Sequence, residues 1–156
     1  MFLLVMLLVD YSDMIRNVTY NDKEIKDEIR QEVGDSYSFF HRLKLGGTGS
    51  PRFVIVEASK DFNNFLELDN NINYCNIELR PEGIIVAFRS LLETFAWIVP
   101  YHMLVLYKSK GTVTVYAGEH FMRLQTLYKN KGDNNFIRKL LHLRSEHHTK
   151  KYEFIT

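Results

Sequence analysis

The stretch that decides the fold runs from Gly83 to Gln125 and reads GIIVAFRSLLETFAWIVPYHMLVLYKSKGTVTVYAGEHFMRLQ. It contains Trp97, the only tryptophan of the chain, within a series of apolar runs that turn residues separate. Such a series is typical of antiparallel strands joined by hairpins. We therefore expect the rest of the fold to be assembled on this stretch.

Two hairpins are predicted in and just before this stretch. In the first, the alternating segment 74–80 is joined to the strand 84–88 by Arg80-Pro-Glu-Gly83, which has the residue types of a β-turn. In the second, the strands 103–108 and 112–116 flank the turn Lys108-Ser-Lys-Gly111. Both hairpins favour an antiparallel sheet.

The segment between the hairpins is harder to assign. Proline cannot donate to a central strand ladder, so Pro100 places Trp97 to Tyr101 at a strand entrance or a sheet edge. We expect Trp97 and Tyr101 to be core anchors, because large aromatic side chains dominate core packing. Residues 90–96 are interpreted as a crossing segment with room for one helical turn.

Three helices are predicted along the chain. Ile25, Ile29 and Val33 recur every four residues after a capping-box spacing at Asn21 to Glu24, which predicts a helix over residues 22–33. A short helix is predicted within residues 58–69 from the spacing of its apolar side chains. After residue 133, an apolar stripe predicts a final helix. The stripe consists of Phe136, Ile137, Leu140, Leu141 and Leu143.

The predicted fold class is α+β, with an antiparallel sheet that is bent or forms a partly open barrel. A C-terminal helix caps the sheet, and an extra helix precedes it. About seven strands are expected, near residues 37–45, 52–57, 74–80, 84–89, 103–108, 112–116 and 120–125. Residues 1–35 form an N-terminal apolar segment and helix, and residues 36–150 form the sheet and terminal helix, all within a single domain.

Three short motifs resemble the pleckstrin-homology superfold as it occurs in uncharacterised bacterial proteins. They are Gly83-Ile-Ile-Val86, Trp97-Ile-Val-Pro-Tyr101 with Leu104, and Phe136-Ile-Arg-Lys-Leu-Leu141. The resemblance covers residues 36–148 and implies a seven-stranded bent sheet plugged by a terminal helix. The tryptophan that eukaryotic members carry in that helix is absent here.

Composition excludes several classes of protein. With 156 residues and a net charge of +1, the chain fits one globular domain and gives no bulk attraction to nucleic acid. The charge is uneven, since residues 1–35 carry four basic and eight acidic side chains, whereas residues 126–156 carry seven and three. Cys75 is the only cysteine, so no internal disulfide is expected and a cytoplasmic location is favoured.

The first nine residues, MFLLVMLLV, are all apolar. A membrane-spanning helix needs roughly 20 such residues, so no transmembrane helix is expected. The run is interpreted as a buried strand or helical turn. The alternative is an interfacial anchor that would make the protein membrane-associated.

Basic side chains surround the glycine-rich segment Gly46 to Ser50. Arg42, Lys44 and Arg52 flank it, and we interpret the segment as the loop of a hairpin. In this position the three cations could hold an anionic lipid or a phosphate, as the corresponding hairpin of pleckstrin-homology domains does. They are the candidate binding residues of the chain.

No pattern of catalytic residues or metal ligands is found in the sequence. Cys75 lies on the apolar side of its predicted strand, and His142 and Glu146 are interpreted as a surface pair on the last helix. His102 and His120 are interpreted as structural. No cofactor or metal is predicted.

Three functions therefore remain open. The first is a noncatalytic interaction module that binds a protein partner or forms a homo-oligomer. The second is a peripheral module for anionic lipid or phosphate. The third is an enzyme without a recognisable motif.

Overall fold

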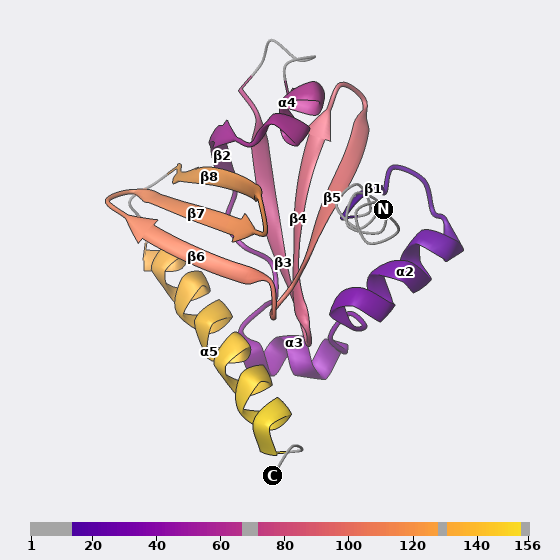
Figure 1. The fold of residues 1–156 in the computed structure, drawn as a ribbon. Helices are drawn as coiled ribbons and strands as arrows, with labels where there is room; N and C mark the ends of the chain where they lie inside the picture. Colours follow the sequence, from indigo (N-terminus) through magenta and orange to yellow (C-terminus); the bar gives the residue numbers. More distant parts are fainter. Residues whose placement is uncertain (1–13, 67–71, 128–130, 154–156) are drawn as a thin grey trace, which may run out of the picture.

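The computed structural model describes residues 14–66, 72–127 and 131–153, so the apolar run at residues 1–9 lies outside the described residues. The described residues form an α+β fold with one open antiparallel sheet (Figure 1). Eight strands have the order β1-β5-β4-β3-β2-β8-β7-β6. The strands are β1 (Ile15–Asn17), β2 (Phe53–Ala58), β3 (Tyr74–Arg80), β4 (Gly83–Ser90), β5 (Glu93–Pro100), β6 (Leu104–Ser109), β7 (Thr112–Ala117) and β8 (His120–Thr126). The helices are α2 (Lys23–Val33), α3 (Phe39–Leu45), α4 (Lys60–Leu66) and α5 (Lys131–Glu153).

Most of the predicted elements are confirmed. Six of the seven predicted strands correspond to β2, β3, β4, β6, β7 and β8, and the helices predicted near residues 22–33 and 58–69 correspond to α2 and α4. The cap of α2 is Asp22 rather than Asn21, since the Asp22 carboxylate accepts a hydrogen bond of 2.9 Å from the Glu24 backbone N–H. The strand count is eight rather than about seven.

The strand predicted near residues 37–45 is wrong, because this segment forms α3. The Ser38 hydroxyl accepts from the His41 N–H at the start of the helix, and Gly46 ends it with a left-handed backbone at φ 73°. These capping interactions outweigh the strand preference of the aromatic residues. Gly46 to Ser50 consequently joins a helix to β2 and is not the loop of a hairpin.

Two strands were not predicted. β1 pairs with β5 through Ile15 and Trp97, and β5 itself replaces the predicted crossing segment. The sequence of β5 shows no alternation of apolar and polar residues, because both faces of the strand are covered, one by the main core and the other by α2. Pro100 stands at the exit of β5 rather than at an entrance, opposite Gly83.

The main core lies between one face of the sheet and α5. Trp97 and Tyr101 are buried as predicted, and Phe136 and Leu140 bring α5 into the same cluster. Figure 1 shows β6 to β8 at an angle to β3, β4 and β5, with α5 running below β6. The angle is spanned by β2, which pairs with both β3 and β8.

A second, smaller core lies on the opposite face of β4 and β5. Ile29 and Val33 of α2 pack there against Ile85, Ala96 and Ile98. The helix therefore covers only the part of this outer face that is nearest the β3–β4 turn (Figure 1).

Candidate anion-binding surfaces

The structure does not bring the three predicted basic residues together. Arg42 and Lys44 lie on α3, whereas Arg52 directly precedes β2. The connecting segment runs along β3, from Thr48, whose carbonyl accepts from the Leu79 N–H, to Phe53, which pairs with Cys75. Four residues of strand separate these two points, a length of about 13 Å. The cations therefore belong to two surfaces.

The first surface is the exposed face of α3, which we call the α3 face. None of the residues of α3 is buried, and Phe39, Phe40 and Leu43 are 69%, 80% and 64% exposed. At 3.6 residues per turn these three side chains share one face, with Arg42 on one side and Lys44 on the other. This arrangement joins an apolar patch to two flanking cations.

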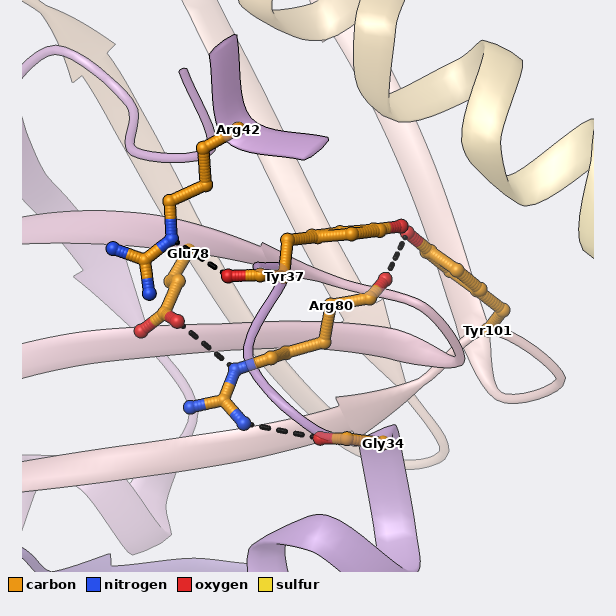
Figure 2. Close-up of polar contacts among 6 residues, drawn as sticks. All are labelled: Gly34, Tyr37, Arg42, Glu78, Arg80 and Tyr101. Atoms are coloured by element: carbon orange, nitrogen blue, oxygen red, sulfur yellow. Dashed lines mark hydrogen bonds and ion pairs between the residues drawn. The ribbon is translucent and has the colours of Figure 1, made fainter. Parts of the chain in front are cut away.

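Contacts at both ends hold α3 in place. The Arg42 Nε donates to the Tyr37 carbonyl at 2.9 Å (Figure 2). This hydrogen bond ties the backbone that precedes α3 to a side chain of the helix. The Lys139 Nζ of α5 donates to the carbonyls of Gly46 and Gly47 at 3.3 and 3.0 Å. The α3 face is thus presented on a fixed helix.

The polar network in Figure 2 has a structural role. Arg80 donates from its Nε to Glu78 at 2.9 Å and from a terminal nitrogen to the Gly34 carbonyl at 3.0 Å. The Tyr101 hydroxyl donates to the Arg80 carbonyl at 2.9 Å. Burial, followed by the neighbouring Tyr37, raises the pKa of Tyr101. The network fixes the β3–β4 turn against the end of α2.

A polar cavity of about 420 Å³ lies beside this network, between α5 and the segment that enters α3. Burial, followed by the Glu146 carboxylate, raises the pKa of the Tyr37 phenol. Across the parts of the chain that the structure describes, no three His, Cys, Asp or Glu side chains converge in a way that could hold a metal ion. The cavity is lined by Asp35, Ser36, Tyr37, Ser38, His41, Pro81, Leu143, Glu146, His147 and Lys150.

Three of the other four candidate positions, Cys75, His120 and the His142–Glu146 pair, fit their structural interpretations, whereas His102 does not. Cys75 is buried, and burial raises the pKa of its thiol to about 12. His120 is also buried, with its Nδ1 2.9 Å from the Asp61 carboxylate. His142 and Glu146 form the predicted surface pair at 3.1 Å. His102 is exposed and therefore has no core role.

The second surface is a groove of about 580 Å³ on the outer face of β3, β4 and β5, which we call the hairpin groove. Arg52 lines it together with Arg89 from the end of β4. Sequence reasoning missed Arg89 because the strand after it was not predicted. The signal was present, since Arg89 follows the alternation of β4 and points away from the core side of Phe88.

Within the described ranges, none of the helices combines the length and the apolar character needed to cross a bilayer. Comparison of the chain with protein-family models, with curated proteins and with solved structures finds no match. The resemblance to the pleckstrin-homology superfold therefore stays a prediction.

Proposed function

We propose that this chain is a noncatalytic binding module that docks on anionic lipid surfaces through the α3 face. The observation that carries the proposal is a helix that buries none of its residues and exposes Phe39, Phe40 and Leu43 between Arg42 and Lys44. Apolar side chains flanked by cations are the pattern of segments that lie in the interface of an anionic membrane. The role proposed for Arg42 and Lys44 is to meet lipid head groups.

The size of the α3 face predicts reversible binding. Inserting three side chains that are about two-thirds exposed contributes roughly 3–6 kcal/mol, and two cations near an anionic surface add about 2 kcal/mol. The total of about 5–8 kcal/mol, before the loss of translational freedom, corresponds to a Kd weaker than about 1 μM. We therefore expect peripheral association that salt weakens.

We also propose that residues 36–150 form a pleckstrin-homology-like unit, with a bent sheet or partly open barrel capped by α5. Supporting observations are the seven consecutive strands β2 to β8, of which the first and last are neighbours, and the helix that follows them. The apolar side of α5 is part of the main core. A crystal structure in which α5 lies away from the core would overturn this proposal.

Vesicle flotation tests the lipid proposal. Wild-type protein is expected to float with phosphatidylcholine vesicles that contain phosphatidylserine, and to float less with phosphatidylcholine alone. Phe39→Ser/Phe40→Ser and Lys44→Glu should each reduce flotation at least several-fold. The matched controls are Val105→Ser/Tyr107→Ser, which changes exposed apolar residues of β6, and Lys110→Glu, which changes an exposed cation.

The proposal fails if wild-type protein does not float with anionic vesicles, or if the control variants lose flotation as much as the α3 variants do. Sedimentation distinguishes lipid docking from the alternative function, which is self-association. A dimer that Phe39→Ser/Phe40→Ser dissociates, without any lipid binding, would assign the α3 face to self-association. Circular dichroism of each variant checks that the fold is retained.

A further inference from the structure

The hairpin groove is a hollow in the outer face of the sheet. Asn76 of β3 pairs with Ala87 of β4, and Thr94 of β5 lines the groove beside them, so short side chains form its floor. α2 covers Ala96 and the residues beyond it toward the β3–β4 turn, but it does not extend over Ala87. The hollow therefore results from the small side chain at Ala87 and from the limited area of the sheet that α2 covers.

Two arginines, Arg52 and Arg89, line this groove. Among the residues that the structure describes, no Asp or Glu lines the groove, and neither Arg52 nor Arg89 forms an ion pair or a hydrogen bond. The Arg52 guanidinium lies 5.1 Å from the centre of the Tyr74 ring, which holds it over the groove wall. Unpaired guanidinium groups favour carboxylate or phosphate, which they bind through two parallel hydrogen bonds.

The rim of the groove is apolar. It is formed by Ile72 and by the β4–β5 turn, where Leu91 is 56% and Leu92 is 83% exposed. Leu91 also has φ 56°, a left-handed conformation that glycine or asparagine adopts with less strain. Two exposed leucines, one of them strained, are unfavourable in a free hairpin turn, and strain of this kind is found where a segment contacts a ligand.

We propose that the hairpin groove binds an amphiphilic anion, in which a carboxylate or phosphate head is attached to an apolar chain. Arg52 and Arg89 receive the head, and the chain lies along Ile72, Leu91 and Leu92. A volume of about 580 Å³ is within the range of small-molecule sites. The groove lies toward the end of β3 that is remote from α3, so this site is independent of the proposed lipid docking.

Titration calorimetry with soluble probes below their micelle concentration tests the site. Dodecanoate and dodecyl phosphate are expected to bind, whereas dodecyltrimethylammonium and inorganic phosphate bind at least about 10-fold more weakly. Arg89→Ala should weaken dodecanoate binding by about 10-fold or more. Ala87→Leu should abolish it by filling the floor while both arginines remain. Arg123→Ala, a change at an exposed arginine of β8, is the control and should bind as wild type does.

Each result decides for or against the proposal. Failure of both anionic amphiphiles to bind overturns it, as does equal binding of the cationic probe or full binding by Ala87→Leu. Equal binding of inorganic phosphate shows that the groove takes a free anion and also overturns it. A preference for dodecanoate or for dodecyl phosphate identifies the head group. The α3 variant Phe39→Ser/Phe40→Ser should bind dodecanoate normally, so a failed flotation experiment leaves this result intact.

Discussion

Replacement of Gly83 by alanine tests the docking of α2 on the sheet. A Cβ atom on Gly83 would lie 2.4 Å from the Val99 carbonyl oxygen, 2.5 Å from Val33 Cγ1 and 2.9 Å from Pro100 Cα. Two of these three atoms belong to the backbone of β5, which cannot rotate away as a flexible side chain can. Gly83 is therefore required for space, since its φ does not lie in the left-handed region.

The expected cost is about 3 kcal/mol, at the upper end of the range for overpacking a core, because both α2 and β5 must shift. For a chain of this length, that loss lowers Tm by roughly 6–12 °C. Urea unfolding followed by circular dichroism measures the free energy of unfolding directly. Gly49→Ala is the control, since its Cβ would meet no atom within 4 Å, and its stability should change by less than about 1 kcal/mol.

A double-mutant cycle assigns the clash to the helix. Val33→Ala removes the Cγ1 atom, so it should be less harmful in the Gly83→Ala background than in the wild type, with a coupling of about 1 kcal/mol. The reasoning is refuted if Gly83→Ala melts within about 2 °C of wild type. Strict additivity of the two substitutions would likewise refute the position of Val33 over Gly83.

Three further predictions concern single side chains. Tyr101→Phe removes the hydrogen bond to the Arg80 carbonyl and should destabilise the protein by about 1 kcal/mol in urea, and an unchanged midpoint would contradict the bond. Cys75 should react with a thiol reagent only as fast as the protein unfolds, and rapid labelling of native protein would contradict its burial. Burial raises the pKa of the Cys75 thiol from 9.0 to about 12 in the folded protein. The contribution of the neutral thiol to the free energy of unfolding is therefore complete below pH 9 and is lost as the pH rises toward 12. Leu91→Asn should raise the free energy of unfolding by about 0.5–1 kcal/mol and weaken dodecanoate binding, whereas a loss of stability would contradict the left-handed φ at this position.

Patterning predicted the elements whose two faces differ. α2, β3 and β6 each have a buried and a more exposed side, so periodicity located them, and turn residues then located β4 and β7 as their hairpin partners. β5 is covered on both faces and follows a turn of two leucines, so neither signal was present. The predicted binding residue Arg52 does line the hairpin groove, but Arg89 requires β5 in place before the groove exists.

The segment around Phe39 shows a different limit. Its aromatic residues favour a strand in isolation, but propensity is a weak prior compared with two satisfied helix ends. Ser38 and Gly46 were the informative residues, and a helix of seven residues between them was readable from the sequence. Arg42 and Lys44 were consequently assigned to a strand that flanks the same hairpin loop as Arg52, although they lie on a helix with a separate surface.

The pairing of β2 with β8 has a consequence for how the chain folds during synthesis. β2 is made early, yet its Ile55 pairs with Leu124, which leaves the ribosome only after β3 to β7 have been made. At typical elongation rates of about 5–20 residues per second, one edge of the apolar strand β2 stays unpaired for seconds on the nascent chain. Closing this ladder is a long-range step, so we expect folding in milliseconds to seconds once β8 emerges. Truncation before β8 should yield a chain that requires chaperones or aggregates.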